Sequence, residues 1–150
     1  MALTITSGPW DHQKVAAWLQ ETVIPIRLAT SGKRGPLVQS LWFEFRDNAL
    51  WCATQQDSAV AKRSRKHPAI GWEVSPDQPP YRGARGRGVV EIIDDPEEAG
   101  EVLQRLIRRY GQSGTDLEGW LLRRVSTEVA LRITDLDVIT WDYSPRMNGE

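Results

Sequence analysis

The segment from Arg82 to Asp94 constrains the fold of this chain most strongly. It alternates as a β-strand does, and its two faces differ sharply in side-chain size. The faces would carry different residues: Ala84, Gly86 and Gly88 on one, and Arg85, Arg87 and Val89 on the other. Glycine weakens a strand and is usually kept where another backbone or a flat ligand approaches closely. The segment therefore predicts a strand with a close neighbour on its bare face.

Further short strands are expected before and after this segment. Apolar or β-branched runs predict them at residues 26–30, 37–45, 50–54, 70–74, 128–133 and 138–141. The polar turns at 31–36 and 47–48 are short, and such connections favour antiparallel hairpins over parallel winding.

Helical patterns lie between these strands. They are expected from Ser7 to just before Pro25, and at residues 58–67, 94–109 and 116–124. Six or seven strands with interspersed helices predict an α+β domain built on an antiparallel, barrel-like sheet.

Length and charge limit the possible functions. The chain has 150 residues, so we expect residues 1–150 to form a single domain. Nineteen basic and twenty acidic residues leave a net charge of -1, which argues against nucleic acid as the main partner. Cys52, the single cysteine, has no disulfide partner, and no apolar run approaches the roughly 20 residues that cross a membrane. We expect a cytoplasmic protein without a membrane or nucleic-acid partner.

The clearest candidate site lies at residues 54–63, where a predicted strand ends and a basic helix begins. Backbone amides at a helix start, the hydroxyl of Ser58 and the ammonium group of Lys62 are groups that bind phosphate. Serine is also a common helix cap for purely structural reasons. The same residues are therefore typical of a capped helix with a solvated basic face, which is the commoner arrangement.

Residues for acid, base or metal chemistry are few. His12 and His67 are the only histidines, and neither stands near a nucleophile or a second metal ligand in the predicted elements. We predict no metal site and assign no catalytic residue. Any redox chemistry would come from a bound cofactor.

The order of several short motifs resembles the pyridoxamine 5′-phosphate oxidase-like superfamily of flavin-binding proteins. The motifs lie between about Ile26 and Trp141: Arg27-Leu28-Ala29-Thr30, Leu41-Trp42-Phe43, Ala53-Thr54, Asp57-Ser58 with Lys62, His67-Pro68, Pro79-Pro80-Tyr81-Arg82-Gly83, Arg87-Gly88 and Thr140-Trp141-Asp142-Tyr143. Their order and spacing together carry the resemblance. It implies an antiparallel split β-barrel of six to seven strands with flanking helices, and a homodimer with two flavin sites at the subunit interface.

The resemblance also implies FMN as the cofactor and indicates which residues hold it. These residues fall into three groups: Val38, Gln39, Ser40 and Leu41 along the ring; Ala53, Thr54, Ser58, Ala59 and Lys62 around the strand-to-helix turn that holds the phosphate; and Arg82 and Trp141, contributed by the second copy.

Two positions depart from the pattern of the superfamily. Many members carry an arginine early in the second strand and a lysine two residues after the serine, where this chain has Val38 and Val60. A related branch binds the 8-hydroxy-5-deazaflavin coenzyme in the same groove, and this coenzyme is the alternative to FMN. Pyridoxamine phosphate oxidase activity itself is not expected. The resemblance implies an arginine and a histidine near the C-terminus that bind the substrate phosphate, and Arg146 is the only basic residue there.

The expected function is that of an FMN-binding oxidoreductase that acts on a small redox substrate of unknown identity. Two alternatives remain open. One is a deazaflavin-dependent reductase, and the other is a flavin-binding protein without turnover.

Overall fold

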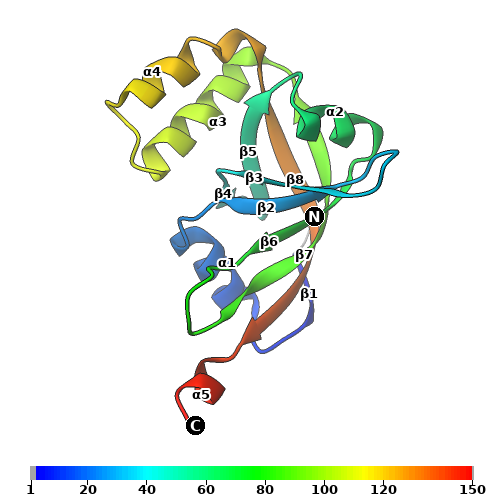
Figure 1. Cartoon of the computed structure of the whole chain (residues 1–150), viewed down its shortest axis with the longest axis vertical. Coiled ribbons are helices and arrows are strands. Elements are labelled where there is room, and N and C mark those ends of the chain that lie inside the picture. The colour runs from blue at the N-terminus through cyan, green and yellow to red at the C-terminus, as the bar shows by residue number, and fades with distance from the viewer. Residues whose placement is uncertain (1–2, 150) are drawn as a thin grey trace.

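The chain folds into a strongly curved sheet with helices on its open sides (Figure 1). The structure, a computed structural model, describes residues 3–149. Its strands are β1 (Thr4–Ser7), β2 (Ile26–Thr30), β3 (Leu37–Leu41), β4 (Glu44–Arg46), β5 (Ala49–Gln55), β6 (Ala69–Val74), β7 (Arg82–Ile93) and β8 (Glu128–Asp142). Its helices are α1 (His12–Glu21), α2 (Ala59–Lys66), α3 (Pro96–Arg109), α4 (Asp116–Leu122) and α5 (Ser144–Met147), with a 3₁₀ turn at Val125–Thr127.

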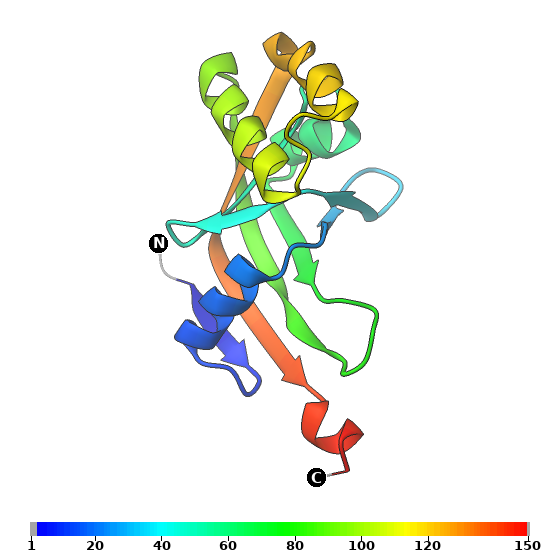
Figure 2. The same ribbon diagram turned by 90° about the vertical axis from the view of Figure 1, so that its left-hand side faces the viewer.

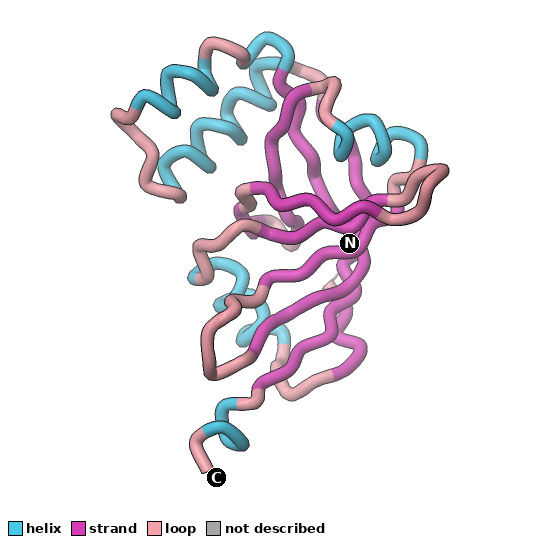
Figure 3. Tube along the Cα trace, viewed as in Figure 1, coloured by secondary structure: helices cyan, strands magenta, loops and turns pink. Residues whose placement is uncertain are grey.

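The strands form one sheet in the order β3-β2-β6-β7-β8-β5-β4, and β1 lies along β8. Every pair is antiparallel except β1 with β8, which is parallel. The sheet curls into a barrel that stays open, because its edge strands β3 and β4 do not pair with each other. Figure 3 shows the curl of the strands. The predicted α+β split barrel is confirmed.

The long strand β8 joins the two halves of the barrel. It pairs with β5 from Glu128 to Ile133 and with β7 along most of its length. The sequence predicted two strands here, at 128–133 and 138–141, and that prediction was wrong. Asp135 adopts a left-handed conformation with φ of 52° where the register with β7 shifts, so the chain bulges and then continues as one strand. Figure 2 shows β8 running from the side of α4 down to α5.

The bare face of β7 packs closely on β8, as its glycines predicted. Arg85, Arg87 and Val89 are exposed on the opposite face. A methyl group at Gly86 would overlap the backbone carbonyl oxygen of Asp137. The close neighbour in this chain is therefore the backbone of β8 and not a flat ligand.

The N-terminal helix begins later than predicted. Residues 4–7 extend along β8, and α1 starts after Asp11, whose carboxylate accepts a 2.9 Å hydrogen bond from the backbone N–H of Lys14. The intervening loop is tied to β8, because the N–H of Trp10 donates to Oγ1 of Thr140 at 3.2 Å. Strand β1 was missed since its pairing partner lies at the other end of the chain.

The predicted strand at 37–45 divides into β3 and β4 around Trp42 and Phe43. Phe43 is fully buried, and its N–H donates to the hydroxyl of Tyr110 at 3.1 Å. Trp42 stacks on the ring of Tyr110 with 5.0 Å between the centroids. These contacts to the end of α3 replace strand pairing at the division. The turn predicted at 47–48 is confirmed, and both of its residues have positive φ.

Helices cover the open sides of the barrel. Helix α2 buries Val60 and Ala61 in the main core, and α3 buries Val102 and Leu106 in a second cluster beside β8. Helix α4 follows α3, and none of its residues is buried. Within residues 3–149, no helix combines the length and the apolar character needed to cross a membrane.

Replacing Gly86 with alanine should destabilise the fold much more than the same change at Gly71 in β6. The added methyl group would meet backbone at Gly86, whereas at Gly71 it would lie 3.5 Å from Cβ of Ala29, an ordinary contact. We expect Gly86→Ala to lower the free energy of unfolding by about 2 kcal/mol or more, and Gly71→Ala to change it by less than about 1 kcal/mol. Urea unfolding followed by tryptophan fluorescence tests this, and equal losses would contradict the packing described.

Candidate functional site

A groove of about 340 Å³ lies at the split in the barrel, between the end of β3 and the end of β5. Its walls are mostly apolar: Leu41 and Trp42 at the end of β3, Leu103 and Leu106 on α3, and Leu117 and Leu121 on α4. A volume of this size falls within the range of small-molecule sites, at its lower end. The groove can therefore enclose part of a flat organic ligand.

Four of the predicted cofactor residues meet in this groove. Ser40 and Leu41 reach it from β3, and Ala53 and Thr54 reach it from β5. Strand β3 is an edge strand that pairs only with β2. Its other edge presents backbone N–H and C=O groups that the sheet does not use. Such an edge beside an apolar wall suits a ring with polar atoms along one side.

The far end of the groove is polar and is held by a hydrogen-bond network. The side-chain amide of Gln55 donates to Oε2 of Glu128 at 2.7 Å and to the backbone oxygen of Arg124 at 3.1 Å. The hydroxyl of Thr127 donates to Oε1 of Gln55 at 2.5 Å. These bonds fix the segment between α4 and β8 against the end of β5.

Glu128 is the buried acid of this network, with 5% of its surface exposed. Burial raises the pKa of its carboxyl group. The hydrogen bond from Gln55 and the charge of Arg124 act in the opposite direction. The groove therefore holds a carboxyl group that gives up its proton less readily than an exposed glutamate does.

The start of α2 has the geometry of a structural cap. Oγ of Ser58 accepts a 3.2 Å hydrogen bond from the N–H of Ala61. Ala59 and Lys62 are exposed on this turn. Val60, where the resemblance in sequence implied a lysine, is 2% exposed and packs in the core. The first turn of the helix thus leaves the backbone N–H groups of Ala59 and Val60 without a partner in the helix and presents one ammonium group, that of Lys62, to solvent, while the side chain at position 60 adds no charge.

Arg63 on the same helix has a structural role. Its guanidinium group donates to Oγ1 of Thr30 at 3.0 Å and to the backbone oxygen of Gly35 at 2.6 Å. These bonds fasten the β2–β3 turn to α2, so this basic group is engaged within the fold.

Two predicted residues of β3 lie outside the groove. Val38 is 64% exposed on the outer face of the sheet. The side-chain oxygen of Gln39 accepts a 3.1 Å hydrogen bond from the hydroxyl of Thr30. The structure therefore brings only the last part of the predicted β3 stretch, Ser40 and Leu41, to the groove.

Arg82 and Trp141 lie at the opposite end of the molecule from the groove. Thr54 pairs with Val129 near one end of β8, whereas Trp141 pairs with Gly83 near the other. The stretch of β8 between Val129 and Trp141 spans roughly 40 Å when extended. These two residues cannot reach the groove of their own chain.

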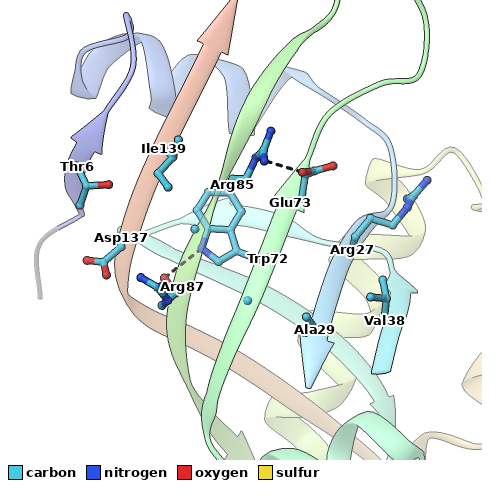
Figure 4. Close-up of a pocket in the computed structure, with 12 residues that line it drawn as sticks. Thr6, Arg27, Ala29, Val38, Trp72, Glu73, Arg85, Arg87, Asp137 and Ile139 are labelled. Atoms are coloured by element: carbon cyan, nitrogen blue, oxygen red, sulfur yellow. Dashed lines mark hydrogen bonds and ion pairs between the residues drawn. The ribbon is translucent and has the colours of Figure 1, made fainter. Parts of the chain in front are cut away.

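A second hollow, of about 700 Å³, lies on the outer face of the sheet (Figure 4). Its floor is formed by the small residues Ala29 and Gly71, and charged side chains of both signs surround it: Arg27, Glu73, Arg85, Arg87 and Asp137. Arg85 lies 3.4 Å from the carboxylate of Glu73 and 4.0 Å above the ring of Trp141. Val38 and Ile139 add exposed apolar surface. This face combines apolar and charged groups, as protein interfaces do.

The sequence analysis missed the helical wall and the polar end of the groove. Leu117 and Leu121 are four residues apart on α4, and this spacing is the signal that could have indicated an apolar face. Gln55 follows the predicted Thr54 directly. Glu128 has no local signal, because its role depends on strand pairing with Gln55, 73 residues earlier in the chain.

Groups for metal binding or nucleophilic chemistry do not gather in the described part of the chain. Residues 3–149 contain no group of three or more His, Cys, Asp and Glu side chains that could hold a metal ion. Cys52 is buried, and burial raises the pKa of its thiol to about 12, so that the thiol stays protonated at neutral pH. Nε2 of His12 lies 2.9 Å from the backbone oxygen of Leu3.

Comparison with known proteins identifies the fold. No protein-family profile and no curated protein sequence matches the chain. Solved structures do match, among them the conserved hypothetical protein Rv2991 from Mycobacterium tuberculosis, with a TM-score of 0.77, 24% identity, and coverage of 95% of this chain and 89% of that one. An F420 reductase matches with a TM-score of 0.67 and 23% identity over 84% of this chain and 94% of its own.

A candidate pyridoxamine 5′-phosphate oxidase from Listeria innocua also matches, with a TM-score of 0.66 and 13% identity over 85% of this chain and 95% of that one. The chain has the split β-barrel fold of these solved structures. The fold that the motifs implied is thereby confirmed. Within this split barrel, the groove lies at the split itself and the second hollow lies on the outer face of the sheet.

The buried acid predicts a specific pH dependence of stability for this split barrel. Folding raises the pKa of Glu128, so the folded chain holds the proton of this carboxyl group more tightly than the unfolded chain does. The stability that this adds is fully present below the unfolded pKa and is lost as pH rises through the folded pKa. We expect the stability of Glu128→Gln relative to the native chain to increase between about pH 4 and about pH 7. Urea unfolding at both pH values measures it, with Glu101→Gln on the exposed face of α3 as the control. A relative stability that stays constant or falls would refute the assignment.

Proposed function

We propose that this split barrel is a flavin-binding oxidoreductase that holds FMN at the split. The observation that carries the proposal is the convergence of Ser40 and Leu41 with Ala53 and Thr54 around an apolar groove beside the start of α2. When bound, the flavin would supply hydride or electron transfer, and the chain would bind and orient it.

The residues present fit the ring of a flavin. The apolar side chains around the groove remove hydrocarbon surface from water, which favours a fused aromatic ring. The free edge of β3 offers the alternating N–H and C=O groups that a ring with polar atoms on one side needs. The groove is too small for a whole FMN molecule, so the ribityl phosphate would extend along β3 towards α2.

The phosphate would meet the exposed first turn of α2. Backbone amides and the helix dipole favour an anion at this position, and Lys62 adds a positive charge one turn into the helix. Many superfamily members place an arginine and a lysine on the phosphate, and this chain has the uncharged Val38 and Val60 at those two positions. Binding of FMN would therefore depend on Lys62 more than it does in those members.

The 8-hydroxy-5-deazaflavin coenzyme, F420, is the second candidate ligand. The structural match to an F420 reductase supports it, and the coenzyme carries a longer polar tail than FMN. That tail could contact the exposed Lys66 in the last turn of α2, whereas the neighbouring Arg65 is already paired with the carboxylate of Asp94. Titration with each coenzyme separates the two candidates, and accelerated oxidation of a reduced donor separates an enzyme from a protein that only binds flavin.

We also propose that the chain works as a homodimer in which the second copy completes the site. Arg82 and Trp141 lie too far from the groove of their own chain, so only a second copy could bring them to it. The outer sheet face supports this, because its mixed charges and exposed Ile139 suit contact with the same surface on a two-fold related copy.

Replacing Lys62 with alanine should weaken FMN binding about tenfold, the effect of losing one charge-assisted hydrogen bond or ion pair to phosphate. Lys66→Ala removes the same charge from the last turn of α2 and should change the affinity less than about twofold. Quenching of flavin fluorescence during titration measures both dissociation constants. Equal weakening in the two variants would show that only overall charge matters, and the phosphate position would then be wrong.

The native chain should sediment with the mass of two chains at micromolar concentration. Ile139→Arg places a bulky charge beside Arg85 and Arg87 on the outer face and should shift the population to single chains. Val23→Arg, at an exposed apolar position away from this face, is the matched control. Analytical ultracentrifugation decides the matter, and a native chain that sediments as one copy would refute the dimer.

A further inference from the structure

One wall residue of the groove at the split, Arg124, brings a positive charge to its polar end. Of the described residues that line this groove, two are ionisable, Arg124 and Glu128. Glu128 is buried and accepts a hydrogen bond from Gln55 within the fold, whereas Arg124 is exposed. The charge that the groove presents to an incoming ligand is therefore positive.

The guanidinium group of Arg124 has no acidic partner in the fold. Between residues 3 and 149 it forms no ion pair and donates no hydrogen bond. Its Cζ atom lies over the ring of Trp120, 4.3 Å from the ring centroid. This contact holds the side chain without an oxygen acceptor, so its N–H groups can still donate to the oxygens of a ligand.

The backbone of Arg124 is fixed beside the start of α2. Its carbonyl oxygen accepts hydrogen bonds from Nε2 of Gln55 and from the hydroxyl of Thr127, both at 3.1 Å. The carbonyl oxygen of Gln55 accepts a 3.0 Å hydrogen bond from the N–H of Ser58, the cap of α2. Gln55 therefore joins Arg124 to the turn in which α2 begins.

Two cations thus flank the end of β5, one on each side. Lys62 lies in the first half of α2, and in the described part of the chain it forms no ion pair either. A phosphate monoester carries nearly two negative charges at neutral pH, and a guanidinium group can bind two of its oxygens at once. Val38 and Val60 supply no charge for this purpose. A phosphate at the end of β5 would accordingly need a cation besides Lys62.

We propose that Arg124 binds the phosphate group of FMN and replaces the charge that Val38 and Val60 do not supply. This inference rests on the proposed flavin function, and it adds a residue from the turn after α4 to the groups that α2 offers. Trp120 is then a positioning residue, because its ring holds the guanidinium group. Arg124 makes the site selective for FMN over riboflavin, which has the same ring system and ribityl chain but no phosphate.

Quenching of flavin fluorescence in titrations with FMN and with riboflavin tests the assignment. We expect the native chain to bind FMN more tightly than riboflavin. Arg124→Gln should weaken FMN binding at least about tenfold and riboflavin binding less than about twofold, because riboflavin lacks the group that Arg124 contacts. Arg124→Lys keeps the charge but not the paired donors, and should bind FMN more tightly than Arg124→Gln does.

Two further variants separate a specific contact from a general effect of charge. Arg123→Gln removes the same charge from the preceding residue, which does not line the groove, and should leave both affinities within about twofold. Trp120→Leu removes the ring under the guanidinium group and should weaken FMN binding about threefold, with riboflavin binding unchanged within about twofold. Thermal unfolding of each variant checks that the fold is kept.

The outcomes distinguish this inference from the proposed function. Equal weakening of FMN and riboflavin binding by Arg124→Gln, or no weakening of either, would overturn the inference while flavin binding still stood. Equal losses of FMN affinity in Arg124→Gln and Arg123→Gln would overturn it too, because only overall charge would then matter. Failure of the native chain to bind either flavin would refute the proposed function and with it the role of Arg124.

Discussion

Strand β8 is the element on which the rest of the structure depends, because it pairs with neighbours on both edges. It joins β5 at one end and β7 along most of its length, and β1 lies beside it. Close approach of β7 requires Gly86, where a side chain would meet the backbone of Asp137. The length of β8 also sets the distance between the groove and Trp141, so Trp141 does not reach the groove of its own chain.

The incomplete barrel makes the groove possible. A closed barrel would pair the free edge of β3, whereas the split leaves this edge facing the end of β5 and lets α3 and α4 supply an apolar wall. The groove contains one buried carboxyl group, that of Glu128, among mostly aliphatic side chains. Under the proposed function, a site of this composition would bind and orient the ligand, and the bound cofactor would supply the reactivity.

Local sequence signals predicted the local structure well. The alternation of β7, the Ser58 cap and the Asp47–Asn48 turn each follow from neighbouring residues, and all three are confirmed. Features that depend on distant partners were missed. Strand β1 pairs with the other end of the chain, and Glu128 reaches the groove only because β5 and β8 are paired. The sequence analysis placed a gap between two strands at the bend around Asp135, because the left-handed conformation of this residue has no clear signal in the sequence.

The most direct measurement is an absorption titration of the purified chain with FMN and, separately, with the 8-hydroxy-5-deazaflavin coenzyme. Our account predicts saturable uptake of one of the two, at one molecule per chain, with the shifted and structured absorption band of a ring held in an apolar groove. Absence of spectral change with both coenzymes, in a chain that is folded by circular dichroism, would contradict the assignment of the groove at the split as a flavin site.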